Sequence, residues 1–247
     1  MNPKARAPVQ RLAPGPRTLN RDVSRYLCRV LRLDKGDAFV AFDPSTYAEA
    51  DAIVDDPSHD GALVTVGELR RAALVAESPL VVIQALAKGD KVDNIIRDAT
   101  ELGATRIVIA RATRCVAKIG DGLAPTRLDR WRRIAEQAAR QCGRADPPSI
   151  DGIFDWPKAL DEARDVDARF CLDKDAIEPL GTRLPTVVTS GASMAFAIGP
   201  EGGLTEEEIE TALDKAFAPV QLGRFVLRTE TVATAVLGAV RVLKSAS

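Results

Sequence analysis

Two glycine-containing segments near the end of the chain carry the residues whose types and spacing could do chemistry. The first, residues 199–203, reads Gly-Pro-Glu-Gly-Gly and lies between an apolar run and a Thr205/Glu208 capping box. The second, residues 222–231, reads Leu-Gly-Arg-Phe-Val-Leu-Arg-Thr-Glu-Thr and leads into a helix rich in alanine and valine. Each segment follows the order of apolar run, sharp loop and helix start. The two loops can therefore lie side by side at the ends of neighbouring strands and form a pocket.

The composition of these loops limits the ligand. Three glycines and a proline within five residues permit positive φ angles and a close approach of the backbone to a ligand. The carboxylates of Glu201 and residues 206–208 disfavour an anion, and the spacing matches neither a dinucleotide fingerprint nor a P-loop. We expect a neutral or cationic small molecule. A tight strand-to-helix turn is the alternative for the first loop alone, but the second loop adds Arg228 and Glu230, which favours a site.

Residues 199–208 and 222–231, in this order near the end of the chain, closely resemble the RsmE family of 16S ribosomal RNA (uracil N3)-methyltransferases. The family belongs to the SPOUT class. The resemblance implies an α/β methyltransferase domain with a trefoil knot, built on a parallel sheet with helices on both faces. It also implies S-adenosylmethionine as methyl donor, no metal, a homodimer, and the 16S rRNA of the small ribosomal subunit as partner.

The same resemblance assigns roles to individual residues. The implied donor contacts are Ile198, Gly199, Glu201, Gly202, Leu222, Gly223, Leu227 and Thr229. The uracil N3 proton must leave during methylation, and a nearby cation would stabilise the oxyanion that forms. We expect Arg228 to supply that cation and Glu230 to orient the base or accept the proton.

Residues 1–75 are expected to form a PUA-like RNA-binding β-barrel domain. The pattern predicts a helix over 21–32 and short strands over 38–42, 47–54 and 62–66. Residues 25–37 resemble the opening motif of the PUA-like domain in this family. The first 25 residues are basic and contain four prolines. They indicate either an RNA-facing arm or a mobile tail.

Residues 76–247 are expected to form the SPOUT methyltransferase domain. A strand, an amphipathic helix and a second strand follow one another over 80–110, which predicts a β-α-β unit and hence a parallel sheet. The remaining predicted helices are 127–142, 206–217 and about 230–243. The remaining predicted strands are 168–172, 194–198 and a weak one at 186–189, while 173–191 otherwise matches no known pattern.

Arginines on two helices and in the basic N-terminal segment are candidates for phosphate contact, because guanidinium groups pair bidentately with phosphates. Gln141 and Arg144 match a Gln-x-x-Arg motif of the family. A solvated helix face is the alternative reading. The candidates are Arg17, Arg25, Arg29, Arg32, Arg133, Arg140 and Arg144.

Composition excludes several classes of protein. The 247 residues are 46% apolar with a net charge of -1, as in an ordinary folded protein. Four scattered cysteines and a single histidine argue against a zinc site and indicate reduced thiols in a cytoplasmic protein. No apolar run is long enough to cross a membrane.

Three alternatives remain open from the sequence. The protein could be another SPOUT methyltransferase, acting on ribose oxygen or on transfer RNA. It could also be a non-catalytic RNA-binding protein that assists ribosome assembly. The apolar face formed by Val232, Val236 and Val240 could pack on a second copy of the chain or into its own core.

Overall fold

The computed structural model describes residues 5–76, 78–117 and 119–245. The chain divides into two compact units. One comprises the chain through Val75 together with Ala139–Pro147, and the other comprises Ala76–Ala138 and the residues from Pro148 onward. The division into functional domains at residues 75 and 76 stays a prediction, and each unit is described by itself.

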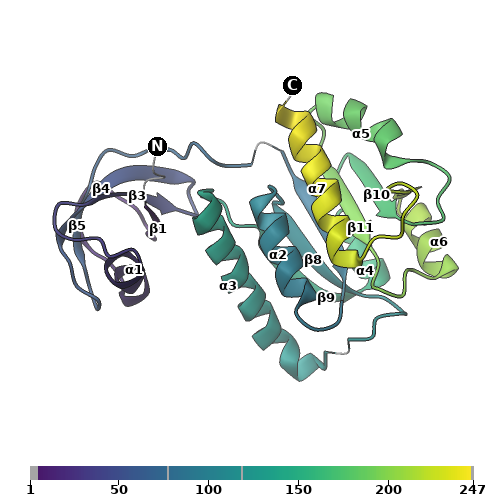
Figure 1. The fold of residues 1–247 in the computed structure, drawn as a ribbon, viewed down its shortest axis with the longest axis horizontal. Coiled ribbons are helices and arrows are strands. Elements are labelled where there is room, and N and C mark those ends of the chain that lie inside the picture. The colour runs from purple at the N-terminus through teal and green to yellow at the C-terminus, as the bar shows by residue number, and fades with distance from the viewer. Residues whose placement is uncertain (1–4, 77, 118, 246–247) are drawn as a thin grey trace. The chain divides into compact units, whose positions relative to one another are not determined.

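The first unit is built on a six-stranded sheet of order β1-β3-β4-β5-β2, with β6 paired to β4 (Figure 1). The side chains of Leu27, Phe39 and Val64 are fully buried on the core face of this sheet. Closure of the sheet into a PUA-like barrel stays a prediction. The elements are β1 (Arg6–Pro8), β2 (Gly15–Thr18), α1 (Arg21–Arg25), the π-helical turn η1 (Tyr26–Val30), β3 (Ala38–Asp43), β4 (Ala48–Asp56), β5 (Leu63–Val66) and β6 (Arg70–Arg71).

The basic N-terminal segment is neither an arm nor a tail over its described residues. Strand β1 pairs in parallel with β3, and β2 pairs with β5 in antiparallel register. The segment packs against the sheet because its apolar side chains are buried. Ala7, Val9 and Leu12 are at most 8% exposed in the core of the first unit. The sequence prediction was based on the arginines and prolines and did not take these apolar positions into account. Residues 1–4 of the segment lie outside the described residues.

The second unit is a parallel α/β fold on a six-stranded sheet of order β12-β10-β11-β7-β8-β9. This confirms the predicted parallel sheet. The strands are β7 (Leu80–Ala85), β8 (Arg106–Arg111), β9 (Ser149–Asp155), β10 (Ala168–Leu172), β11 (Met194–Ile198) and β12 (Ala218–Val220). The helices are α2 (Lys91–Glu101), the short turn η2 (Asp121–Leu123), α3 (Ala124–Cys142), α4 (Trp156–Asp161), α5 (Leu180–Thr189), α6 (Glu206–Asp214) and α7 (Thr229–Ser245).

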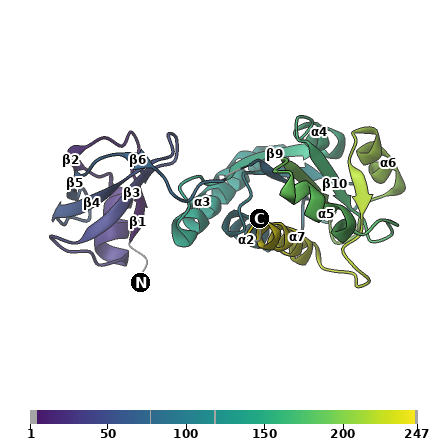
Figure 2. The same ribbon diagram turned by 90° about the horizontal axis from the view of Figure 1, so that it is seen from above.

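Helices cover both faces of this sheet (Figure 2). Successive strand residues point to opposite faces, so each central strand needs apolar side chains at nearly every position. In β11, Phe196 packs with α2, α3, α5 and α7, whereas Ala195 and Ala197 face α4 and α6. The central strands are therefore the continuous apolar runs seen in the sequence.

Two parts of the second unit differ from the sequence prediction. Residues 186–189 belong to helix α5 and not to a strand, because Leu180, Leu184 and Val188 recur at four-residue spacing and bury one helical face. The β-branched run and Pro185 inside the helix obscured this pattern. Strand β9 and helix α4 had no predicted counterpart.

Because the paired strands are parallel, their carboxyl ends meet at one edge of the sheet, where ligands of open α/β sheets bind. The two glycine loops follow β11 and β12 at this edge. The loops after β7, β8 and β10 reach the same edge from other parts of the chain.

Candidate functional site

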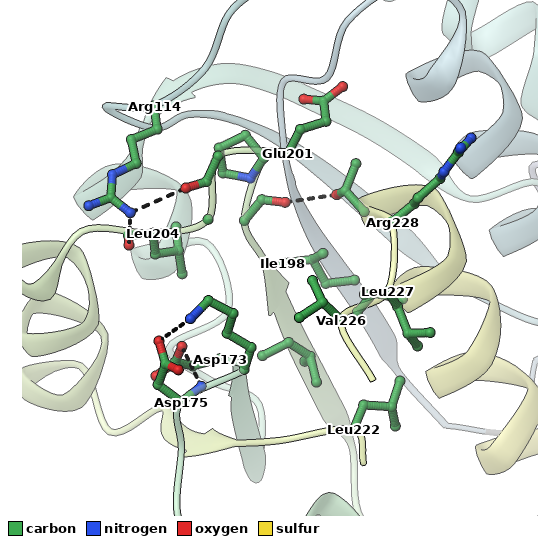
Figure 3. A pocket seen from close by; sticks show the side chains of 18 of the residues that line it. Arg114, Asp173, Asp175, Ile198, Glu201, Leu204, Leu222, Val226, Leu227 and Arg228 are labelled. Carbon is green, nitrogen blue, oxygen red and sulfur yellow. Dashed lines mark hydrogen bonds and ion pairs between the residues drawn. The ribbon is translucent and has the colours of Figure 1, made fainter. Parts of the chain in front are cut away.

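The loops at the carboxyl edge enclose a cavity of about 460 Å³ (Figure 3). The volume lies within the usual range for small-molecule sites. All eight predicted donor-contact residues line the cavity, and so does Arg228. In Figure 3 the apolar side chains of Leu222, Val226 and Leu227 lie across from Asp173 and Asp175. Lys174, which also lines the cavity, is ion-paired with Asp175. The cavity thus has an apolar wall and a charged wall.

The first glycine loop leaves no room for side chains at two positions. A Cβ atom at Gly199 would lie 2.9 Å from the Leu204 Cγ atom, and one at Gly202 would lie 3.0 Å from the Arg114 Cβ atom. Arg114 also fixes this loop by donating from Nη1 to the carbonyls of Gly202 and Leu204 at 3.2 and 3.1 Å. The backbone of the loop is therefore held in place and exposed to the cavity.

Thr229 connects the two glycine loops. Its hydroxyl donates to the Gly199 carbonyl at 2.7 Å and accepts a hydrogen bond from Gln84 Nε2 at 2.9 Å. Thr229 and Gln84 are both buried. The first residue of α7 is thereby joined to the ends of β11 and β7.

The Thr229→Val variant is expected to unfold at lower temperature than the wild type. Valine keeps the shape but leaves the Gly199 carbonyl and one Gln84 N–H without this partner, which costs about 1–3 kcal/mol of unfolding free energy. Thr231→Val is the matched control, because Thr231 is exposed in the same helical turn. Denaturant titration of the two variants checks the prediction, and equal stabilities would contradict it.

A second connection runs through Lys91, the first residue of α2. Its Nζ atom lies 2.9 Å from Glu201 Oε1 and 3.5 Å from Glu230 Oε2. The Lys88 backbone N–H donates to the same Glu201 oxygen at 3.0 Å. Glu230, one of the two predicted catalytic residues, therefore lies beside the cavity, in contact with the Lys91 side chain.

This ion pair shifts the pKa values of both Lys91 and Glu201. Hydrogen bonding to Glu201 raises the pKa of Lys91, although partial desolvation opposes the shift. Burial opposes ionisation of Glu201, but the bonds from Lys91 and Lys88 outweigh it and lower the pKa of Glu201. The pair is thus fully charged between the ordinary values of 4.5 and 10.5. Its stabilisation is lost as the pH falls through the lowered pKa of Glu201 or rises through the raised pKa of Lys91.

The predicted phosphate-contact residues differ in their surroundings. Arg25, Arg29, Arg32 and Arg133 are exposed. Arg17 is half-buried and donates to the carbonyls of Arg11 and Gln10.

Arg140 and Arg144, near the end of α3, are held by contacts within the first unit. The Arg140 guanidinium lies 5.4 Å from the centre of the Tyr26 ring. Arg144 is only 7% exposed and pairs with both carboxylate oxygens of Asp146 at 3.0 Å. Arg144 is therefore engaged in a buried ion pair in this structure, and its contact with RNA stays a prediction.

The apolar face of α7 packs into its own chain. Val236 and Val240 are at most 1% exposed, in the core that α7 forms with α2, α3 and α5 on one face of the sheet. Val232 lines the cavity. This decides the alternative left open by the sequence in favour of core packing. The homodimer stays a prediction and cannot use these two valines.

Sequence reasoning missed three site residues, namely Gln84, Lys91 and Arg114. A signal existed for Lys91, because it begins the helix that follows an apolar strand, and ligands of parallel sheets bind at that edge. Gln84 is a polar residue inside an apolar strand and is fully buried. A buried amide needs hydrogen-bond partners, so its position already indicated a structural or functional contact.

The described part of the chain shows no cluster of three His, Cys, Asp or Glu side chains suited to a metal. Burial raises the pKa of the Cys115 thiol and raises that of Cys171 to about 12, so neither thiol is an activated nucleophile. Among the described helices, none combines the length and the hydropathy that crossing a bilayer requires.

A model of the RNA methyltransferase domain family matches residues 76–241. Ribosomal RNA small subunit methyltransferase E of Mycobacterium bovis is 32% identical over 229 residues, which cover 91% of this chain and 85% of the relative. The Synechocystis protein of the same name is 34% identical over 230 residues, covering 92% and 73%. The crystal structure of the Neisseria gonorrhoeae methyltransferase E, bound to S-adenosyl methionine, is 27% identical, with a TM-score of 0.86 over 97% of this chain and 98% of that one. The chain belongs to the ribosomal RNA small subunit methyltransferase E (RsmE) family.

Proposed function

We propose that the protein uses S-adenosylmethionine to methylate N3 of a uridine in the 16S rRNA of the small ribosomal subunit, in the cytoplasm. The observation that carries the proposal is the cavity between the two glycine loops. Its lining holds every residue that the family resemblance assigns to the donor. The N. gonorrhoeae relative, whose structure has S-adenosyl methionine bound, supports the choice of donor.

The residues present fit this donor. Gly199 and Gly202 let the loop pack tightly against Leu204 and Arg114 while its backbone lines the cavity, where it could contact an adenine ring. Leu222 and Leu227 supply apolar surface for the ring. Asp173 supplies negative charge for the cationic end of the molecule, while Asp175 and Glu201 are ion-paired with Lys174 and Lys91. When bound, the donor supplies an electrophilic methyl group on a good leaving group, so positioning provides much of the rate.

Glu230 is suited to accept the uracil N3 proton. Its Oε2 atom is buried and has no hydrogen-bond partner among the described residues, apart from the ion-pair contact with Lys91 at 3.5 Å. A buried acceptor with unused capacity is costly in a folded protein and often marks a ligand contact. An N–H group of the substrate would satisfy it.

Arg228 is suited to stabilise the negative charge that then develops on the uracil oxygen. Its side chain is exposed, and it borders the cavity one residue before α7 begins. Figure 3 shows its guanidinium extending away from Leu222 and Leu227. A cation in a preformed position stabilises developing charge without a reorganisation cost.

Each unit carries exposed arginines that are suited to contact RNA phosphates. Arg25, Arg29 and Arg32 are exposed in and after α1 and η1, and Arg133 is exposed on α3. Such contacts add affinity and salt dependence rather than base specificity. A PUA-like barrel, a trefoil knot and a homodimer complete the proposed architecture, in keeping with membership of the family.

The test is methyl transfer from labelled S-adenosylmethionine to small subunits that lack base modifications, followed by digestion and mass analysis of the nucleosides. We expect 3-methyluridine. The matched reaction uses the Gly199→Ala variant, which should incorporate little label. A 2′-O-methylated nucleoside, or label only on transfer RNA, would replace the proposal with another SPOUT activity. Binding of RNA without any transfer would favour an assembly factor.

A further inference from the structure

We infer that Lys91 is a positioning residue. Its ammonium group binds both Glu201, in the glycine loop of residues 199–203 (the donor loop), and Glu230, the carboxylate that accepts the proton. The inference rests on the proposed function, because it assigns Lys91 a part in that reaction. Lys91 begins α2, Glu201 belongs to the loop after β11, and Glu230 lies in the first turn of α7. Three segments distant in sequence thus meet at one nitrogen atom.

The charges at this point require a cation. The side chains of Glu201 and Glu230 are 26% and 24% exposed, and both have an oxygen within 3.5 Å of Lys91 Nζ. Two carboxylates brought this close repel each other unless a positive charge lies between them. Removing one partner of a mostly buried ion pair leaves a carboxylate without compensation.

Lys91 is held in place by the packing of its own helix. Val92, Ile95 and Ile96 of α2 are at most 3% exposed and belong to the same core as Val236 and Val240 of α7. The start of α2, which carries Lys91, is therefore packed in the same core as α7, which carries Glu230. The Lys88 N–H holds Glu201 independently of Lys91, so what Lys91 adds is the positive charge and the connection to α7.

This arrangement matters during proton transfer. The N3–H bond of uracil breaks, an O–H bond forms on Glu230, and the electron pair stays on the base. The negative charge thereby leaves Glu230, whose partner Lys91 remains positive. A fixed cation beside the proton acceptor then stabilises the anionic base, together with Arg228. Lys91 thus acts through Glu230 and through the donor loop.

The experiment compares Lys91→Met, which keeps most of the apolar stem, with Lys91→Arg, which keeps the charge. Arg97→Met is the matched control, because it removes an ion-paired cation from α2 that does not line the cavity. Donor affinity is measured by calorimetry, and the rate by single turnover at saturating donor. We expect Lys91→Met to weaken donor binding and to lower the rate, each by about tenfold, the size typical of contacting charged residues. Lys91→Arg should recover part of both losses, because it keeps the charge but not the geometry of the ammonium group. Arg97→Met should stay near the wild type.

A double-mutant cycle separates positioning from folding. If Lys91 acts through Glu230, adding Lys91→Met to Glu230→Gln should lower the rate by only about twofold, because the shared interaction is already lost. Equal losses in both backgrounds, with a matching drop in melting temperature and no recovery in Lys91→Arg, would mean a purely structural role and would overturn the inference. Wild-type affinity and rate in Lys91→Met would do the same.

The pH dependence of donor binding gives a readout that does not involve RNA. Glu201 is bonded by Lys91 and the Lys88 N–H, and it shares Lys91 with the carboxylate of Glu230. It also interacts with the Cys115 thiol, which stays neutral because its pKa is raised. Without Lys91, protonation of Glu201 should begin at higher pH, so donor affinity should decline earlier on acidification than in the wild type. This measurement stands even if the acceptor is not a uridine. Failure of the Lys91 inference is therefore distinguishable from failure of the proposed function.

Discussion

The Arg228→Ala variant is expected to transfer methyl groups to small subunits about a hundredfold to a thousandfold more slowly than the wild type, which is the usual effect of removing one preorganised group that stabilises developing charge. Its affinity for S-adenosylmethionine should be unchanged. The Arg228 carbonyl accepts the N–H groups of Thr231 and Val232 at 2.8 and 3.0 Å, so the opening turn of α7 is held by the backbone. Truncating the side chain leaves those bonds intact and removes only the charge.

Single-turnover assays at saturating donor, with calorimetry of donor binding, measure both quantities. Arg224→Ala is the matched control, since Arg224 is exposed in the same loop and does not line the cavity. Arg228→Lys keeps the charge but not the planar geometry, and it should recover part of the rate. A wild-type rate in Arg228→Ala would remove Arg228 from the mechanism.

The Gly199→Ala variant is expected to bind S-adenosylmethionine at least about tenfold more weakly, since forcing one methyl group into a packed site typically costs about 1–3 kcal/mol. The added Cβ would lie 2.9 Å from Leu204 Cγ and 3.4 Å from the Leu204 backbone nitrogen. The Cγ atom is a branch point close to the backbone and not the tip of a flexible side chain, so either Leu204 or the loop must shift. A shift of the loop would also move the Gly199 carbonyl, which accepts the Thr229 hydroxyl.

Gly181→Ala provides the control for this variant. Gly181 lies in α5, and a Cβ atom there meets nothing within 4 Å. Alanine is favoured over glycine inside helices by about 1 kcal/mol, so this variant should be slightly more stable and should bind the donor normally. Donor binding by calorimetry and unfolding by denaturant are measured for both. Donor affinity in Gly199→Ala within twofold of the wild type would show that close backbone approach is not needed here.

Local pattern predicted most elements of the second unit. The buried parallel strands β7, β8, β10 and β11 are short apolar runs, and α2 has a single strongly apolar face. Helices cover both faces of the sheet, so its strands need apolar side chains at nearly every position, and this pattern is visible in the sequence. The end of helix α5 was predicted as a strand because its β-branched residues favour strands. In the folded protein, the leucines and the valine at four-residue spacing are buried in the core, which stabilises a helix instead.

The arginines show what pattern alone cannot decide. Arg133 and Arg144 belong to the same basic stretch of sequence, yet one is exposed and the other is buried against Asp146. A guanidinium group serves equally well as a solvated charge, a phosphate contact or a structural ion pair. The choice depends on neighbours that are brought close only by folding.

The sequence by itself determined the family, the position of both glycine loops, and nine of the residues that line the cavity, because these depend on rare local combinations of glycine, proline and capping residues. Only the tertiary structure decided what joins the loops. Gln84 and Thr229 are 145 positions apart, and Lys88 and Glu201 are 113 apart. No local periodicity records such pairs, since they are selected by strand order at the carboxyl edge of the sheet. The parallel sheet brings together side chains whose shared role cannot be read from their spacing in the chain.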